Sequence, residues 1–161
     1  MKMRILPVLL LSSLLLGGCA LQADSGPTPD PRLTGIWTTR EDRLRVSLDD
    51  TGKPQTDVPV GQWYAFLSNG RYVHIARYMT FAIGGVQVEE GSYASTSEGL
   101  TLTGRTRSFF PDEGSPQKAE FRVAEDGDMS LVFRAAEEDG VKALRIRASA
   151  EDAEVLYRLC S

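Results

Sequence analysis

Hydrophobic and polar residues alternate along much of this chain, which is the period-two pattern of strands with one buried face. Leu44, Val46 and Leu48, for example, alternate with Arg45 and Ser47. Other segments are rich in the aromatic and β-branched residues that favour strands. Together these patterns predict strands at 44–48, 62–67, 72–78, 79–88 with a continuation to 93, 100–103, 119–123, 129–134 and 141–148. Segments rich in turn-forming residues predict loops at 49–59 and 109–116.

Turn sequences separate these segments. Asn69-Gly70 stands between 62–67 and 72–78, and Asn-Gly between two such runs predicts that they pair as a hairpin. Asp126-Gly127 and Asp139-Gly140 separate the last three predicted strands from one another. We therefore expect those three strands to form consecutive hairpins.

The end of the chain fits two different structures. Ser149 and Asp152 have the spacing of a helix capping box, and apolar residues follow at helical spacing. The same segment also reads as a loop followed by a strand at 154–159. We favour the strand, because a closed barrel needs a last strand to cover the edge of the first.

The number of strands decides the fold class. Eight or nine short antiparallel strands at regular spacing make an all-β chain and favour a closed up-and-down β-barrel of about eight strands. A two-sheet β-sandwich has the same sequence pattern and is the alternative. Segment 72–78 is apolar on both faces, so we expect it to be covered on both sides. Beyond the core, that cover is another part of this chain, a ligand or a partner protein.

The first residues have the pattern of a secretory signal. Lys2 and Arg4 precede an apolar run at 5–16, which is too short to span a bilayer core that needs about 20 residues. Small residues then lead to Cys19, as they do at a cleavage site. We therefore expect residues 1–18 to be a signal peptide that is removed.

The run Leu16-Gly17-Gly18-Cys19 resembles the lipobox of bacterial lipoproteins, in which the cysteine becomes the new N-terminus and carries acyl chains. The alternative is an ordinary signal peptide with a cysteine there by chance. Ala20 follows the cysteine where the inner-membrane retention signal of such lipoproteins has Asp. The resemblance thus implies a lipid anchor in the outer membrane on its periplasmic face. Residues 19–32 contain proline at alternate positions and predict an extended tether, and 33–161 form one domain.

Charge excludes one class of partner. The chain has 18 basic and 22 acidic residues and a net charge of −4, which becomes −6 when Lys2 and Arg4 leave with the signal peptide. No cluster of basic residues appears, so we do not expect nucleic acid binding. Membrane attachment is expected through the anchor alone. If Cys19 carries lipid, Cys160 has no partner within the chain, and it either packs as a small apolar residue or pairs between molecules.

Residues with catalytic chemistry are few. His74 is the only histidine, and the chain has no Gly-x-Ser-x-Gly sequence of the kind that presents a nucleophilic serine. One histidine and one cysteine make a zinc site improbable. Glu89 and Glu90 are neighbours on a predicted strand, so they point to opposite faces and do not form an acid and base pair. We expect no catalytic residues, no metal and no cofactor, and hence not an enzyme.

Several short sequences are similar to those of lipocalins and lipocalin-like bacterial proteins. Gly35-Ile36-Trp37 is similar to the Gly-x-Trp that opens the first strand of that family. Segment 66–72 resembles the Phe-x-x-Asp/Asn-Gly-x-Tyr/Phe hairpin of the same group. Glu90-Gly91-Ser92-Tyr93 with 100–102 resembles its Gly-x-Tyr strand and the partner of that strand. The resemblance covers roughly 33–103, under half of the chain.

What the resemblance implies is a barrel with Gly35 and Trp37 at a closed end and an open mouth for a small apolar ligand such as a lipid. The alternative is an interior filled by side chains, since eight strands permit either. The residues expected to line the mouth are Tyr64, Phe66, Tyr72, His74, Tyr78 and Phe81. The function expected is that of a lipid-anchored periplasmic binding protein. The alternative is an envelope accessory or inhibitor protein that uses the region 72–81 against a protein partner.

Overall fold

A computed structural model describes residues 29–55, 57–77, 84–113, 115, 119–149 and 151–160. The predictions for Cys19, Tyr78 and Phe81 lie outside these residues. Within them the regular structure is entirely β, and no helix is long and apolar enough to cross a membrane. The strands are β1 (Gly35–Thr38), β2 (Gly61–Phe66), β3 (Arg71–Arg77), β4 (Gly85–Ser95), β5 (Gly99–Pro111), β6 (Phe121–Ala124), β7 (Met129–Glu138), β8 (Val141–Arg147) and β9 (Val155–Leu159).

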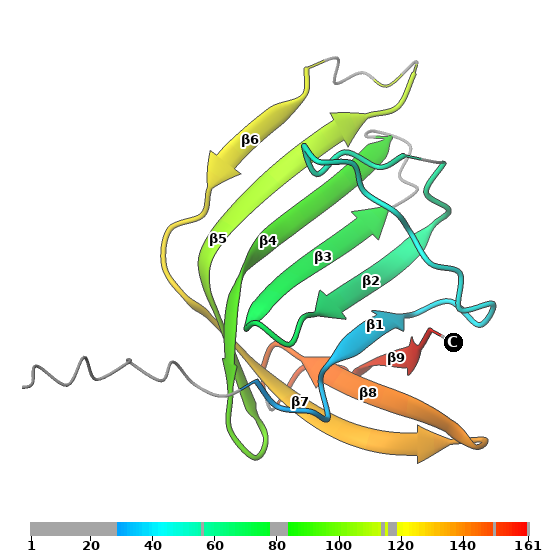
Figure 1. Ribbon diagram of the computed structural model, residues 1–161, viewed down its shortest axis with the longest axis vertical. Coiled ribbons are helices and arrows are strands. Elements are labelled where there is room, and N and C mark those ends of the chain that lie inside the picture. The colour runs from blue at the N-terminus through cyan, green and yellow to red at the C-terminus, as the bar shows by residue number, and fades with distance from the viewer. Residues whose placement is uncertain are drawn as a thin grey trace, which may run out of the picture.

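Eight of the strands close into an antiparallel barrel. Their order is β4-β3-β2-β1-β9-β8-β7-β5, and the pairing of β5 with β4 completes the ring (Figure 1). Strand β6 lies outside this ring and pairs only with β5. The prediction of an all-β barrel of about eight strands is therefore confirmed over the sandwich, and the barrel is compatible with a lipocalin-like fold.

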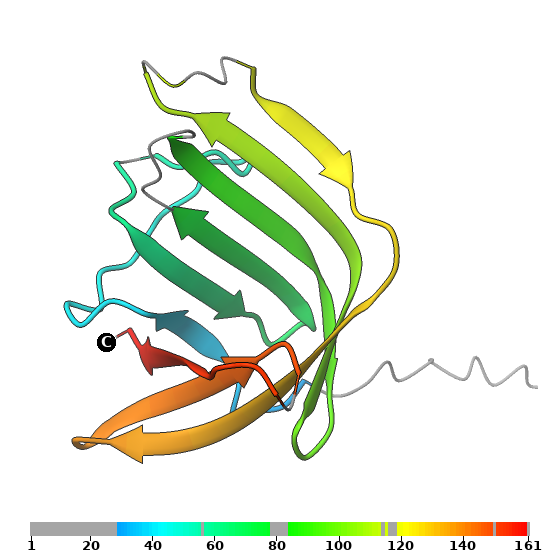
Figure 2. The ribbon, with the colours of Figure 1, turned by 180° about the vertical axis from the view of Figure 1, so that it is seen from behind.

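The long strand β5 divides the barrel into two ends. Its first residues, Gly99 to Leu102, pair with β7, and its later residues, Thr106 to Phe109, pair with β6. Gly104 lies between the two parts with a φ of 55°, which a glycine adopts readily. Seen from behind, β6 and β7 leave β5 in different directions (Figure 2). The barrel is thus closed through β7 at one end and extended by β6 at the other.

Aromatic and aliphatic side chains fill the interior at the closed end. Trp37 is 2% exposed, and its indole Nε1 donates a hydrogen bond to the carbonyl oxygen of Leu33 at 2.6 Å. Gly35 precedes it at a φ of 143°, and a Cβ there would lie 2.7 Å from Cδ1 of Leu159. The buried members of this inner core are Leu33, Trp37, Tyr64, Phe66, Tyr72, Tyr93, Leu100, Leu102, Leu131, Phe133, Leu144, Ile146 and Tyr157.

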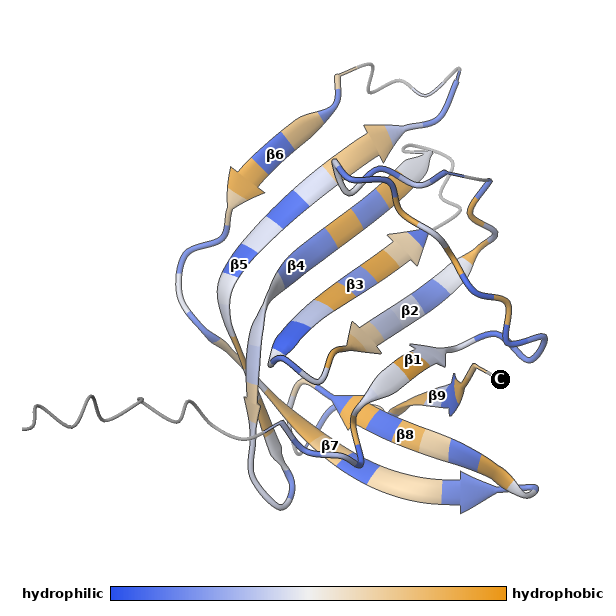
Figure 3. Ribbon diagram, viewed as in Figure 1, coloured by the Kyte–Doolittle hydropathy of each residue, from blue (hydrophilic) through white to orange (hydrophobic). Residues whose placement is uncertain are grey.

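A second core lies on the outer face of β2, β3 and β4, whose residues alternate in hydropathy (Figure 3). The chain between β1 and β2 crosses in front of these strands (Figure 1) and packs Val46, Leu48 and Val58 against them. Trp63 donates a hydrogen bond from Nε1 to the carbonyl oxygen of Leu44 at 2.7 Å. A loop of the same chain therefore covers the second apolar face of β3.

Two predictions about pairing are wrong. The strand expected at 44–48 is absent, and only an isolated bridge joins Leu48 to Pro54. Val46 and Leu48 of this segment pack onto the outer core. This packing explains the alternation of apolar residues without a paired strand. The hairpin expected between 119–123 and 129–134 is also absent, because β6 and β7 both pair with β5. β5 continues to Pro111, into the loop predicted at 109–116, and so has room for both partners.

Two predicted hairpins and the predicted last strand are present in the structure. β2 pairs with β3 across Gly70, which has a φ of 78°. β7 pairs with β8 across Asp139 and Gly140, both with positive φ, as a two-residue hairpin turn requires. The C-terminal segment is a strand, β9, which pairs with β1 and β8 and closes the barrel.

Candidate functional site

Polar side chains form a layer inside the barrel, next to the aromatic core. They occupy strand positions that alternate with the outer core residues Trp63, Ile75 and Val88, so they lie on the inner face. We call this layer the inner polar network. Its members are Gln62, Tyr72, His74, Glu89, Arg105 and Tyr157.

A buried ion pair is the centre of the inner polar network. The guanidinium of Arg105 donates from Nη2 to Oε2 of Glu89 at 2.7 Å and from Nε to Oε1 at 3.3 Å. The side chains are only 11% and 7% exposed, respectively. The hydroxyl of Tyr72 donates to Oε1 of the same carboxylate at 2.7 Å. Removing both charges from water is costly, and these three hydrogen bonds offset that cost.

The surroundings of Glu89 keep it ionised. Burial alone would raise the pKa of its carboxyl group, but the hydrogen bonds from Arg105 and Tyr72 outweigh burial and lower that pKa. Burial and the hydrogen bond to Glu89 raise the pKa of the Tyr72 hydroxyl, which therefore stays protonated. The pair and the tyrosine thus form a neutral unit at physiological pH, in which both carboxylate oxygens of Glu89 accept hydrogen bonds.

His74 belongs to a second, uncharged part of the inner polar network. Its ring stacks on Tyr64 with the centroids 4.2 Å apart and the planes 12° from parallel. Its Nε2 lies 3.3 Å from Oε1 of Gln62, which also accepts a hydrogen bond from the hydroxyl of Tyr157 at 2.9 Å. Burial lowers the pKa of His74 to about 4, although the charge of Glu89 opposes this. The imidazole is therefore neutral at pH 7.

An apolar patch lies beyond the inner polar network, towards β6. Phe109 and Phe121 stack with centroids 5.5 Å apart, and Phe121 and Val123 are 37% and 41% exposed. These side chains share the inner face with Arg107, because β5 pairs residue for residue with β6. Arg107 forms an ion pair with Glu125 at 2.7 Å. From the closed end to β6, the inner surface is therefore first apolar and then polar, and it ends in the exposed Phe121 and Val123 beside the ion pair of Arg107 with Glu125.

Two of the six predicted ligand-lining residues, Tyr72 and His74, belong to the inner polar network, and Tyr64 and Phe66 lie in the adjoining core. Phe66 is 1% exposed and lies entirely in the inner core. The rings of Tyr64 and Tyr72 also belong to the core, and the hydroxyl of Tyr72 enters the network. His74 lies directly in the network, while Tyr78 and Phe81 are outside the described residues. The structure thus places the tyrosine rings and Phe66 beneath the polar layer and His74 within it.

Sequence reasoning missed the charged members of the inner polar network. Glu89 points inwards to Arg105, and Glu90 points outwards to Arg122, as neighbours on a strand must. The inward side of Glu89 was detectable, because Val86 and Val88, which precede it at odd spacings along the strand, are apolar and belong to the other face. Arg105 was not detectable, because a β-bulge shifts the register of β4 and β5 beside it.

The described residues contain no group of three or more His, Cys, Asp or Glu side chains that could hold a metal ion. Cys160 directly follows β9 and is buried, its backbone N–H donates to the carbonyl oxygen of Ile36 at 2.8 Å, and burial raises the pKa of its thiol. The hydrogen-bonding groups of the inner polar network are suited to holding the polar end of a small molecule. No family model, curated protein or solved structure matches the chain.

Proposed function

We propose that this protein binds a small amphipathic molecule on the inner face of its barrel. The observation that carries the proposal is the ion pair of Glu89 and Arg105 inside the barrel. Apolar residues at these positions would stabilise the fold as well or better, because desolvating two charges is costly. A buried polar cluster with shifted pKa values is the kind of feature that marks binding sites.

The order of surfaces inside the barrel supports an amphipathic ligand. The polar end would meet the inner polar network at Gln62, His74 and Glu89, where neutral and charged acceptors lie side by side. The apolar part would rest on Phe109, Phe121 and Val123, which are the apolar side chains beyond that network. A fatty acyl compound or another lipid has this division into a polar end and an apolar body.

The location is also a proposal. We infer that Cys19 carries a lipid anchor, on the strength of the lipobox-like sequence that precedes it. The described chain begins beside the closed end of the barrel, where Leu33 is fully buried under Trp37. An anchor upstream of this point would hold the closed end nearer the outer membrane. The end that carries β6 would then face the periplasm.

The alternative of a protein partner concerns 72–81, of which the structure describes 72–77, and none of these six residues is exposed. Tyr72, Ile75 and Ala76 are each at most 6% exposed, because the inner core and the loop before β2 cover them. We therefore propose the ligand-binding function alone. If the experiments below find no ligand, the result favours the alternative of a protein partner.

A blocking substitution tests the binding proposal. Gln87 lies on the inner face between Ala76 and Phe109. Gln87→Trp should abolish the saturable binding of a fluorescent fatty acid to residues 24–161, because the indole occupies the space beside Phe109. Thr106→Trp is the matched control, since Thr106 pairs with Glu90 on the outer face. Equal binding by both variants, or no saturable binding by the parent chain, would contradict the proposal.

A further inference from the structure

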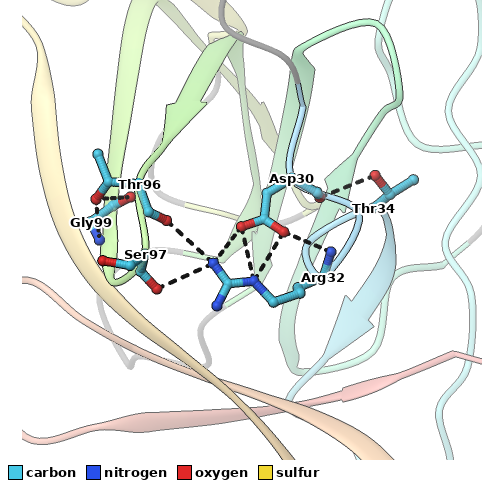
Figure 4. Close-up of polar contacts among 6 residues, drawn as sticks. All are labelled: Asp30, Arg32, Thr34, Thr96, Ser97 and Gly99. Atoms are coloured by element: carbon cyan, nitrogen blue, oxygen red, sulfur yellow. Dashed lines mark hydrogen bonds and ion pairs between the residues drawn. The ribbon is translucent and has the colours of Figure 1, made fainter.

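The first described residues form an arm that is tied to the closed end of the barrel. Arg32 forms an ion pair with Asp30 at 2.6 Å and donates hydrogen bonds to the carbonyl oxygens of Thr96 and Ser97 at 3.3 and 3.2 Å (Figure 4). Its guanidinium also lies 5.2 Å from the centre of the Phe133 ring. Arg32 thus connects the arm to the turn between β4 and β5 and to β7.

A pocket of about 450 Å³ lies beside Arg32 along β7 and β8. This is the size of a small-molecule site. Four arginines and two glutamates supply its charged lining, on a chain whose net charge is −4. The charged residues are Arg32, Arg134, Arg145, Arg147, Glu98 and Glu154.

The arginines of this pocket are placed where they repel one another. Arg134 on β7 is directly opposite Arg145 on β8, and Arg147 is two positions further along the same face. Like charges that face each other across two strands are destabilising. An arrangement of this kind is stabilised when an anion lies between the guanidinium groups.

The anion that the chain itself supplies to both Arg134 and Arg145 is the carboxylate of Glu154. It lies 3.2 Å from Nη2 of Arg134 and 3.4 Å from Nη1 of Arg145, so one carboxylate is shared by two guanidinium groups. Desolvation alone would raise the pKa of Glu154, but these two arginines lower it. Arg145 also pairs with Glu138. The side chain of Arg134 is 65% exposed, so its pair with Glu154 is weak and open to competition.

We propose that this pocket is a second binding site, which takes a phosphate group between Arg134 and Arg145 in place of Glu154. The planar guanidinium group presents two parallel donors that match phosphate oxygens. A phosphate brings more negative charge than one carboxylate, so it compensates the facing guanidinium groups of Arg134 and Arg145 more fully than Glu154 does. The site lies outside the barrel and needs neither the inner ligand nor the anchor.

The direct test uses the full-length chain in a non-ionic detergent and follows the arginine Nε–H signals by NMR. Addition of inorganic phosphate, against chloride at the same ionic strength, should move a subset of these signals in a saturable way. Arg134→Gln should weaken the binding about tenfold, which corresponds to the loss of one charge-assisted hydrogen bond. Arg122→Gln is the matched control, because Arg122 is an exposed arginine on β6 with a single carboxylate partner, Glu90.

A second variant separates a binding site from a structural ion-pair cluster. Glu154→Gln removes the competing carboxylate, so phosphate should bind more tightly to this variant than to the parent chain. If the cluster were only structural, Glu154→Gln would show no saturable phosphate response. That result, or an unchanged response in Arg134→Gln, would overturn the proposal.

The source of the phosphate group is distinguished by the choice of probe. Inorganic phosphate and glycerol phosphate represent free phosphate compounds, and short-chain phosphatidylglycerol represents a lipid headgroup. A response to the soluble probes assigns the pocket to free phosphate compounds, and a response to the lipid alone assigns it to a membrane surface. A response to none of the three contradicts the proposal.

Discussion

Arg105→Met tests the energetic role of the buried ion pair. The substitution replaces the guanidinium group by a shorter, unbranched apolar side chain and leaves the carboxylate of Glu89 with a single hydrogen bond, from Tyr72. The side chain of Glu89 is 7% exposed, so water replaces the lost partner poorly. Breaking a buried pair by removing one partner costs about 3–5 kcal/mol, and we expect a loss of about 3 kcal/mol at pH 7.

The pH dependence distinguishes the charge from the packing. Without Arg105, burial should raise the pKa of Glu89 above the ordinary value of 4.5. The deficit in stability should then shrink as the pH falls and Glu89 takes up a proton. A deficit caused by lost packing alone would remain the same at every pH.

The assay is urea unfolding followed by the fluorescence of Trp37 and Trp63. Arg122→Met is the matched control, because it breaks the ion pair of Glu90, the next residue, on the exposed face. Its side chain is 55% exposed, so the control should lose at most about 1 kcal/mol. Glu89→Gln combined with Arg105→Met should recover most of the stability, since no buried charge is left unpaired. A loss under about 1 kcal/mol in Arg105→Met would refute the reasoning.

Three further predictions concern single residues. Trp37→Ala should lower the free energy of unfolding in urea by about 3–5 kcal/mol, because it leaves a cavity at the closed end and removes the hydrogen bond to the carbonyl oxygen of Leu33. A loss well under about 1 kcal/mol would show that the indole is not a core residue. Burial lowers the pKa of His74 from 6.5 to about 4, so the unfolded chain takes up a proton first and the protein should lose stability as the pH falls between these values. His74→Gln should abolish that loss. A variant with the same pH profile as the parent chain would contradict the assigned burial. Gly91→Ala should lose about 1–3 kcal/mol, because its Cβ would lie 2.6 Å from the carbonyl oxygen of Thr103, and a melting temperature equal to that of the parent chain would argue against this close approach.

Local signals in the sequence were sufficient for two of the predicted hairpins. Asn69-Gly70 and Asp139-Gly140 each join strands that pair with each other, as the turn residues predict, whereas the strands on either side of Asp126-Gly127 both pair with β5. The strand β9 followed from the need to cover the edge of β1. These are predictions that depend on adjacent residues or on the closure of the barrel.

Pairing between distant segments was not predictable in the same way. The alternation of Leu44, Val46 and Leu48 reports that one side of the segment is buried, and a loop that packs onto a sheet satisfies this as well as a strand. The partner of β6 depends on the length of β5, which continues through Phe110 into a predicted loop. Burial patterns therefore indicate which side faces inwards but leave the neighbour undetermined.

The candidate site was predictable only in part for the same reason. The aromatic residues of β2 and β3 follow from their alternation, and Tyr64 and His74 face each other across that hairpin. Glu89 and Arg105 meet because β4 and β5 pair across a register shift between Glu90 and Ser92. One extra residue changes which side chains face inwards beyond it, and periodicity in the sequence does not reveal that shift.

Native mass spectrometry of residues 24–161, secreted to a bacterial periplasm without the anchor, tests the proposed binding function most directly. A co-purifying mass of lipid size that is lost on denaturation is the predicted result, and Gln87→Trp should be free of it. A clean mass of the protein alone, repeated after incubation with envelope lipids, would contradict the binding of an amphipathic ligand inside the barrel.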